Sequence, residues 1–166
     1  MTLNTMELKT TDLCDAHIEK LHVAEPIGFK DYGGKKVFNG KIVTLKCFEA
    51  NPLVRKTLEQ NGEGKVLVVD GGGSMRCAML GDMLGDLAVK NKWNGIIVYG
   101  CVRDSADLAK LDVGVKALNT HPMKSARTLE GQENITVRFA GINFIPNEFV
   151  YCDEDGIVVS KEALSL

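Results

Sequence analysis

The chain has 166 residues, and its 20 lysine and arginine residues nearly balance its 22 aspartate and glutamate residues, for a formal net charge of -2. Hydrophobic residues make up 45% and charged residues 25%, as in an ordinary globular domain. This length predicts one domain over residues 1–166. The near-neutral charge argues against direct nucleic-acid binding, which requires a basic patch. No apolar run reaches about 18 residues and the N-terminus is not a signal peptide, so we expect no membrane contact and a cytoplasmic location.

The number and spacing of the cysteines are also those expected of a cytoplasmic protein. Their number is odd, and no pair has Cys-x-x-Cys or Cys/His spacing, so neither a disulfide framework nor a zinc site is indicated. We expect them to be reduced residues that mostly pack in the core. They are Cys14, Cys47, Cys77, Cys101 and Cys152.

The first third of the chain predicts a helix, a strand and a second helix. Residues 10–12 offer an N-cap for a short helix over residues 13–18. Residues 38–48 have the β-branched content of a strand. Asn51 and Pro52 are then typical of the N-cap and first residue of another helix.

The middle of the chain predicts a βαβ unit. Residues 65–70 are a continuous apolar run, as expected of a strand buried on both faces, and glycines 71–73 end it. A helical pattern follows from Leu80 to about Trp93. Residues 96–99 form a second buried strand.

The remainder of the chain is predicted to be rich in strands. A short helix covers residues 105–111, and Gly141 and Asn147 mark turns. The short strand candidates are residues 113–118, 135–139, 142–145 and 157–159. The fold class is therefore α/β, with mixed sheets around the central βαβ unit.

Polar residues follow the two buried strands, where open α/β sheets bind their ligands. The first strand runs into residues 71–76 and the second into residues 100–104. If the strands are neighbours, these loops lie side by side. Residues 81–84 come early in the connecting helix and can reach the same place.

These stretches carry the chemistry of an oxo-acid site. The guanidinium of Arg103 can bind a carboxylate or phosphate with two hydrogen bonds, and Asp104 is a hard oxygen ligand. Asp82 and Asp107 add two carboxylates. An arginine would hold the substrate carboxylate while a cation takes the keto oxygen and stabilises an enolate. Backbone N–H groups could hold an anion at Gly81, Asp82, Met83 and Leu84.

Structural explanations of the same residues stay open. An Arg-Asp pair in a loop is commonly a solvated surface pair. The glycine run 71–73 fits neither phosphate-binding motif and can be a tight turn with positive φ. Asp82 and Asp86 can be the polar face of a helix. No serine lies in a nucleophile elbow, so a histidine-based triad has no support.

At these residues the sequence resembles the RraA family. The matching stretches are residues 11–16, 66–76, 81–84, 95–104 and 155–160. The resemblance implies a swivelling β/β/α domain and a ring-like homotrimer with sites at subunit interfaces. Some members are regulators that bind and inhibit RNase E. Others are metal-dependent class II aldolases that cleave 4-hydroxy-4-methyl-2-oxoglutarate, often with oxaloacetate decarboxylase activity.

The aldolase members resemble one another in an Asp, twenty residues, Arg-Asp, two residues and an acid. Here these positions are Asp82, Arg103, Asp104 and Asp107. The resemblance implies that Asp104 ligates Mg²⁺ or Mn²⁺ while Asp82 and Asp107 hold its waters. Arg103 would bind the carboxylate of pyruvate, and the backbone of residues 81–84 would complete the substrate cradle.

The resemblance leaves two functions to separate. The first is a metal-dependent oxo-acid lyase. The family's dedicated aldolases have a C-terminal extension beyond the position of Leu166, so we expect decarboxylation at least comparable to aldol cleavage. The alternative is a non-catalytic regulator of RNase E. A menaquinone methyltransferase, a third name used in the family, has no support in the residues.

Overall fold

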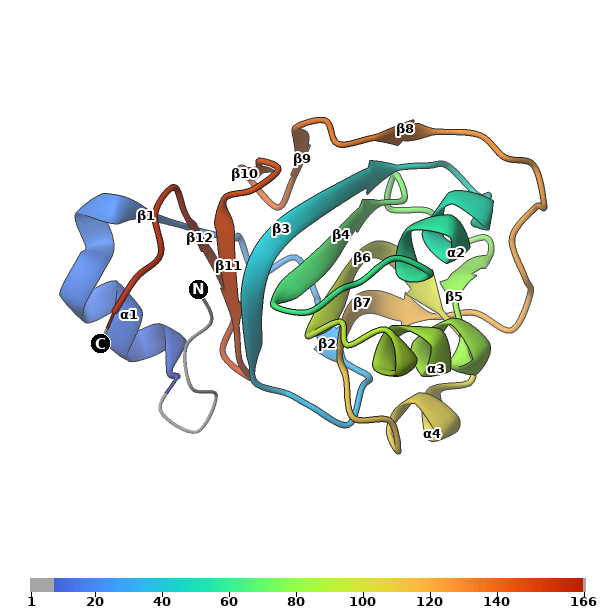
Figure 1. Ribbon diagram of the computed structural model, residues 1–166, viewed down its shortest axis with the longest axis horizontal. Coiled ribbons are helices and arrows are strands. Elements are labelled where there is room, and N and C mark those ends of the chain that lie inside the picture. The colour runs from blue at the N-terminus through green and yellow to red at the C-terminus, as the bar shows by residue number, and fades with distance from the viewer. Residues whose placement is uncertain (1–7, 166) are drawn as a thin grey trace.

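A large mixed sheet dominates the computed structural model, which describes residues 8–165 (Figure 1). The prediction that the N-terminus is not a signal peptide depends mainly on residues 1–7, which lie outside this range. Leu166 lies outside it as well. The helices are α1 (Thr10–His17), α2 (Pro52–Leu58), α3 (Asp82–Lys90) and α4 (Ser105–Leu108), with a 3₁₀ turn at Ile18–Lys20. The strands are β1 (Leu21–Val23), β2 (Lys30–Asp31), β3 (Phe38–Lys46), β4 (Lys65–Asp70), β5 (Ala78–Leu80), β6 (Gly95–Val102), β7 (Gly114–Thr120), β8 (Gln132–Glu133), β9 (Val137–Phe139), β10 (Ile142–Phe144), β11 (Phe149–Cys152) and β12 (Ile157–Ser160).

The sheet has a parallel centre and antiparallel edges. Its strand order is β1-β12-β11-β3-β4-β6-β7-β2, with β5 on β6 and β8 on β3. β3, β4, β6 and β7 pair in parallel, while β11, β12, β1 and β2 join antiparallel. The predicted βαβ unit is confirmed as β4, α3 and β6, because β4 and β6 are direct parallel neighbours. Their carboxyl ends therefore meet at one edge.

Each face of the parallel centre carries its own hydrophobic core. Along β4, Leu67 and Val69 face the core under α2 and α3. Val66 and Val68 face the opposite core, which the β9–β10 hairpin covers. Side chains alternate between faces along a strand, so a strand covered on both sides must be apolar throughout. The continuous apolar run of β4 follows from this burial.

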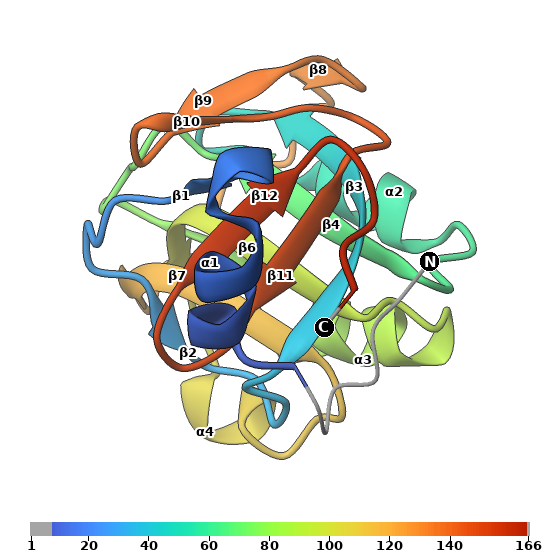
Figure 2. The same cartoon turned by 90° about the vertical axis from the view of Figure 1, so that its left-hand side faces the viewer.

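A third layer lies at the antiparallel end, where α1 packs across β11 and β12 (Figure 2). Leu13 of α1 joins Tyr151 and Val158 in a small core of its own. Asp153, in the turn between β11 and β12, accepts hydrogen bonds from the amide and hydroxyl of Thr10, each at 2.7 Å. These contacts fix the beginning of α1 on the sheet.

The prediction that a helix runs from Leu80 is wrong. Residues 78–80 form β5, which pairs parallel with β6, and α3 begins at Asp82. Cys77, Ala78, Met79 and Leu80 are all buried, so the run has the pattern of a fully covered strand rather than a helix with one apolar stripe. The other helices and strands lie near their predicted positions, except that β1, β2, β8 and β11 were not predicted.

The cysteines are free in the structure, as predicted, and four of them are buried. Burial raises the pKa of the Cys47 thiol to about 11, which keeps it protonated at neutral pH. Within residues 8–165 no helix has both the length and the apolar composition needed to cross a bilayer.

Candidate functional site

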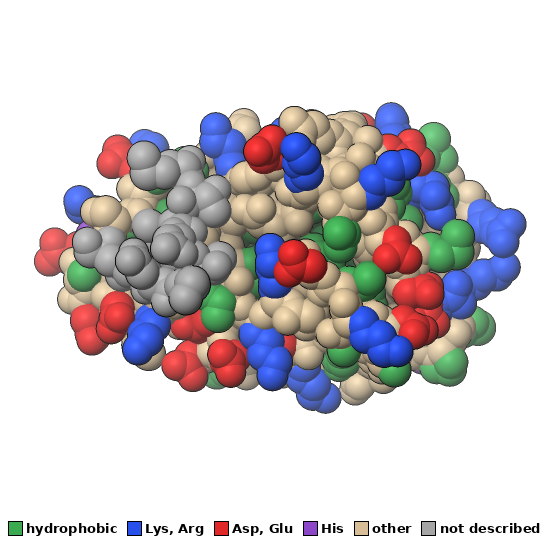
Figure 3. Space-filling model, turned by 60° about the horizontal axis from the view of Figure 1, so that its bottom comes forward, with side chains coloured by type: hydrophobic (Ala, Val, Ile, Leu, Met, Phe, Trp, Pro, Cys, Tyr) green, Lys and Arg blue, Asp and Glu red, His purple; other side chains and the backbone are tan. Residues whose placement is uncertain are grey.

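A cavity of about 450 Å³ opens where α2, β5, α3 and the loop after β6 converge. Its lining includes all the predicted site residues except Asp107, namely Gly81, Asp82, Met83, Leu84, Arg103 and Asp104. Acidic and basic side chains are interspersed over the face in Figure 3. Both signs gather toward its right-hand end, where α2, β5 and α4 lie in Figure 1. The structure thus brings six of the predicted site residues to one cavity, while Asp107 lies outside its lining.

The unpredicted strand β5 sets this geometry. It pairs Leu80 with Val102 of β6, and the carbonyl of Leu80 accepts a hydrogen bond from the amide of Arg103 at 2.9 Å. The chain then enters α3, and the amide of Asp82 donates to Oδ2 of Asp104 at 3.2 Å. Two segments 22 residues apart in the sequence are thereby held together.

Gly81 is required by close approach rather than by its backbone angles. Its φ is -137°, which any residue can adopt, and it is the N-cap of α3. A Cβ at this position would lie 2.6 Å from Oδ2 of Asp104 and 3.2 Å from Cγ of Arg103. The missing side chain therefore lets the two functional side chains lie against the start of the helix.

Asp104 holds an uncommon backbone conformation. Its φ and ψ are 55° and 43°, in the left-handed region that costs most non-glycine residues energy. The residue is the N-cap of α4, and its carbonyl accepts hydrogen bonds from the amides of Asp107 and Leu108 at 3.0 and 2.9 Å. These bonds hold the turn that aims the Asp104 carboxylate back toward Gly81 and Asp82. Such strain is concentrated at functional sites.

The charged side chains at the site are only weakly paired with one another. Nε of Arg103 lies 4.0 Å from Oδ2 of Asp104, at the limit of an ion pair. The hydrogen bond between the carboxyl groups of Asp82 and Asp104 raises the pKa of Asp82, and partial burial and the charges of Asp104 and Asp107 add to the shift. Two carboxylates this close repel each other when both are ionised, so a cation beside them is favourable.

The donor set fits a magnesium-type ion. Within residues 8–165 no group of three or more His, Cys, Asp or Glu side chains is arranged to hold a metal. Mg²⁺, however, is commonly bound by one or two carboxylates and several waters. Asp104 and Asp82 supply such a pair at the rim of an open cavity. A zinc site, which needs three or four protein ligands, does not fit.

Asp107 lies on α4, outside the cavity lining. Its amide bonds to Asp104, and its charge contributes to the raised pKa of Asp82. Met83 and Leu84 both line the cavity; Leu84 is buried in the core and Met83 is exposed. Sequence reasoning missed further lining residues, namely Asn51, Arg55, Lys124, Ser125 and Arg127.

The glycine loop lies outside the lining of the cavity beside Asp104. Its neighbourhood with β6 is confirmed, since the amides of Gly71 and Gly73 both donate to the carbonyl of Tyr99 at 3.1 Å. Gly72, however, lines a different hollow of about 520 Å³, together with residues such as Phe48 and Arg138. Gly72 and Gly73 both have a φ of +70°, which supports the interpretation as a tight turn. The structure therefore places Gly72 outside the lining of the cavity that Arg103 and Asp104 share.

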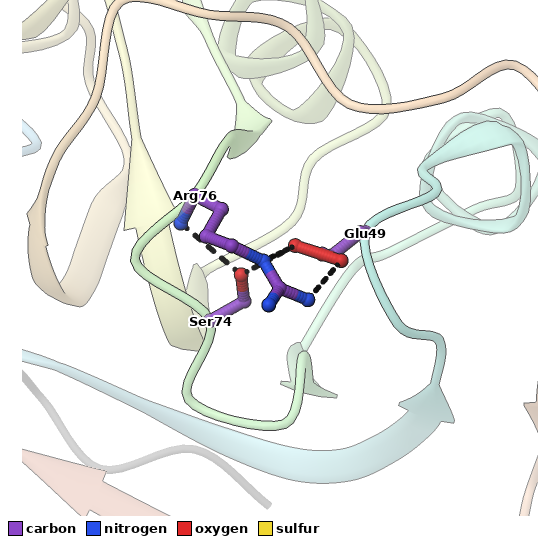
Figure 4. Close-up of polar contacts among 3 residues, drawn as sticks. All are labelled: Glu49, Ser74 and Arg76. Atoms are coloured by element: carbon purple, nitrogen blue, oxygen red, sulfur yellow. Dashed lines mark hydrogen bonds and ion pairs between the residues drawn. The ribbon is translucent and has the colours of Figure 1, made fainter.

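An ion-pair network closes this loop (Figure 4). Glu49 accepts hydrogen bonds from Nε and an Nη of Arg76 at 2.8 and 2.7 Å, and from the hydroxyl of Ser74 at 2.9 Å. These bonds lower the pKa of Glu49 to about 2. The charges after β4 are thus satisfied internally.

Comparisons with known proteins agree with one another on the family. The RraA-like family model, Aldolase/RraA, matches residues 10–159. A protein of Alkalilimnicola ehrlichii, provisionally named 4-hydroxy-4-methyl-2-oxoglutarate aldolase, is 55% identical over 159 residues, which cover 96% of this chain and 98% of that protein. A similarly named protein of Aromatoleum aromaticum is 54% identical, covering 96% of this chain and 99% of that one.

Two solved structures have the same fold under different names. The RNA-processing inhibitor RraA from Thermus thermophilus superimposes with a TM-score of 0.92 at 41% identity, covering 96% of both chains. A Geobacillus kaustophilus protein described as an S-adenosylmethionine:2-dimethylmenaquinone methyltransferase also has a TM-score of 0.92, at 44% identity, covering 95% of this chain and 97% of that one. The fold class is confirmed, and the chain belongs to the Aldolase/RraA family.

Proposed function

We propose that this protein is a divalent-metal-dependent lyase acting on oxo-acids. Its reactions would be cleavage of 4-hydroxy-4-methyl-2-oxoglutarate and decarboxylation of oxaloacetate. The observation that carries the proposal is the convergence of Arg103, Asp104 and Asp82 on one cavity at the carboxyl end of β6. The provisional names of relatives at 50–55% identity support the same reaction class.

We assign each residue a role from its position or from the family resemblance. Arg103, bound only weakly to Asp104, can hold the carboxylate next to the keto group with two hydrogen bonds. Asp104 would ligate Mg²⁺ or Mn²⁺, with Asp82 and Asp107 holding bound waters. The cation would supply Lewis-acid stabilisation of the charge that develops on the keto oxygen. The backbone of residues 81–84 would border the substrate.

Both reactions break one carbon–carbon bond and leave the electron pair on C3. In oxaloacetate, the bond between C3 and the distal carboxylate breaks, CO₂ leaves, and protonation of C3 gives pyruvate. In 4-hydroxy-4-methyl-2-oxoglutarate, the C3–C4 bond breaks while the C4 hydroxyl loses its proton, which releases one pyruvate, and protonation of C3 gives the second. Arg103 would keep the C1 carboxylate fixed during either cleavage.

The test is pyruvate formation from oxaloacetate, measured with added Mg²⁺ and with EDTA, against the spontaneous rate. We expect EDTA and Asp104→Ala each to reduce the rate at least about a hundredfold. Asp86→Ala is the matched control, because Asp86 is an exposed carboxylate on α3 outside the cavity. Full activity of Asp104→Ala would rule out the assignment.

A non-catalytic regulator of RNase E is the second candidate, and the likeness to the Thermus inhibitor favours it. Binding would require only a complementary surface, without turnover. Pull-down of RNase E by the wild type and by Arg103→Ala and Asp104→Ala would support this function if all three bind equally. Absence of binding at low salt would remove it.

We also propose a homotrimer in the cytoplasm. Large apolar side chains are exposed at Phe48, Met75, Met83, Met123 and Leu129, and Met83 belongs to the cavity lining. Exposed apolar side chains beside the cavity would be covered if the site lies at a subunit interface, as the family resemblance implies. Light scattering of the purified protein would give the oligomeric state, and a monomer at all concentrations would contradict it.

A further inference from the structure

The cavity beside Asp104 has more cationic groups than one substrate carboxylate needs. Besides Arg103, its lining includes Arg55 of α2 and Lys124 and Arg127 from the segment between β7 and β8. The acids in the lining are Asp82 and Asp104, which face each other. Within residues 8–165, the side chains of Arg55, Lys124 and Arg127 form no ion pair or hydrogen bond.

The segment that carries two of these cations is held in place by its backbone. Ala78 of β5 donates its amide to the carbonyl of Met123 at 2.8 Å, and Ala126 donates its amide to the carbonyl of Glu49 at 2.8 Å. Parallel bridges link Ala78 with Lys124 and Ala50 with Ala126. In Figure 1 this segment passes the end of the sheet beside β5 and α2. Lys124 and Arg127 therefore lie beside the cavity because the fold puts them there.

A buried polar group in the same segment also lacks a partner. Ser125 lines the cavity, is 6% exposed, and its hydroxyl has no hydrogen-bond partner among the described residues. A buried hydroxyl without a partner is unfavourable, so such groups in native structures require an explanation. A ligand oxygen in the cavity would give this hydroxyl the hydrogen-bond partner that it lacks.

We propose that Arg55, Lys124, Ser125 and Arg127 form a distal subsite for a second carboxylate, so that the cavity selects oxo-diacids over oxo-monoacids. The proposal rests on the proposed function for the position of the first carboxylate on Arg103. It adds which residues would recognise the other end of the substrate. A cavity of about 450 Å³ is in the usual range for small-molecule sites, about 300–1,000 Å³.

The subsite is tested with two ligands that differ only at the distal end. 2-Oxoglutarate and 2-oxopentanoate have the same oxo-acid group and chain length, but the first ends in a carboxylate and the second in a methyl group. Calorimetric titration of the full-length protein with Mg²⁺ gives the ratio of their affinities. We expect the wild type to bind 2-oxoglutarate at least about tenfold more tightly, the size of a charge-assisted hydrogen bond.

Substitutions then assign the preference to residues. Lys124→Met combined with Arg127→Met should bring the affinity ratio close to one while leaving 2-oxopentanoate binding unchanged. Ser125→Ala should reduce the ratio without lowering the melting temperature, because its hydroxyl makes no bond to lose. Lys110→Met is the matched control, an exposed lysine outside the cavity, and should keep the wild-type ratio.

The outcomes separate this proposal from the proposed function. Equal affinity for the two ligands, no binding of 2-oxoglutarate, or a ratio unchanged by the double substitution would each overturn the subsite. Pyruvate formation with an affinity ratio of one would leave the lyase assignment standing and remove the subsite alone. A clear preference for 2-oxoglutarate without pyruvate formation from oxaloacetate would support the subsite and remove the lyase assignment.

Discussion

The loops after β4 and β6 begin at neighbouring positions of one sheet edge, but they differ in whether their charged side chains are paired. After β4, Arg76 makes two hydrogen bonds to Glu49, which lower the pKa of that carboxyl. After β6, Arg103 is 4.0 Å from its nearest carboxylate oxygen, and the nearby acids raise the pKa of Asp82. Satisfied charges hold a fold together, whereas unsatisfied ones at a cavity are available to a ligand.

The two arginines provide the most direct test of this contrast. Arg103→Met should raise the KM for oxaloacetate roughly thirtyfold, or about 2 kcal/mol, because the substrate carboxylate loses its bidentate partner. Arg76→Met is the matched control and should lower the melting temperature while leaving KM close to the wild-type value. Steady-state kinetics and thermal unfolding of both variants measure this. Similar effects of both changes on KM would contradict the division between the loops.

A second comparison concerns two glycines with different reasons to be glycine. Gly81→Ala should reduce kcat about tenfold, because its Cβ would displace the Asp104 carboxylate by a fraction of an ångström to one ångström. Its melting temperature should change little, since φ at this position suits alanine. Gly156→Ala is the control, with no atom within 4 Å of the added carbon. An unchanged kcat in Gly81→Ala would mean that the carboxylate need not lie there.

Gly72 should show the opposite behaviour. Its φ is +70°, and an added Cβ would lie 2.6 Å from the ring of Phe48. Gly72→Ala should therefore cost about 1–2 kcal/mol of unfolding free energy from backbone strain, while kcat and KM stay near wild type. Chemical denaturation with parallel kinetics would check this. A loss of activity without a loss of stability would indicate that the glycine loop contributes to the functional site after all.

The parts that sequence reasoning predicted correctly are those where local pattern and burial agree. The apolar run of β4 predicts a strand buried on both faces, and it is one. β5 was misread because Leu80, Leu84 and Leu87 continue a helical spacing across Gly81, and only pairing with β6 makes residues 78–80 a strand. Local pattern is a weak guide to so short a strand.

The candidate site divides in the same way. Arg103 and Asp104 directly follow a predicted strand, so the rule for open α/β sheets identifies them. Lys124, Ser125 and Arg127 lie in a stretch with no periodicity, and their position depends on two backbone hydrogen bonds to distant segments. No sequence signal marks such contacts. Arg55 lies one turn after Pro52 on α2, but nothing in that helix indicates which side of the sheet it covers.

The smallest expected effect concerns the loop after β4, where Glu49 is hydrogen-bonded to Arg76 and Ser74. The folded pKa of Glu49, about 2, lies below the ordinary value of 4.5, so this network stabilises the folded state above about pH 4.5 and loses that contribution as the pH falls toward 2. Glu49→Gln should therefore melt below the wild type at pH 7, and the difference should shrink as the pH is lowered. Glu63→Gln is the control, since the side chain of Glu63 has no hydrogen bond or ion pair among the described residues and should show no such trend. A difference between Glu49→Gln and wild type that stays constant from pH 7 to pH 3 would mean that the carboxylate charge contributes nothing to closing this loop.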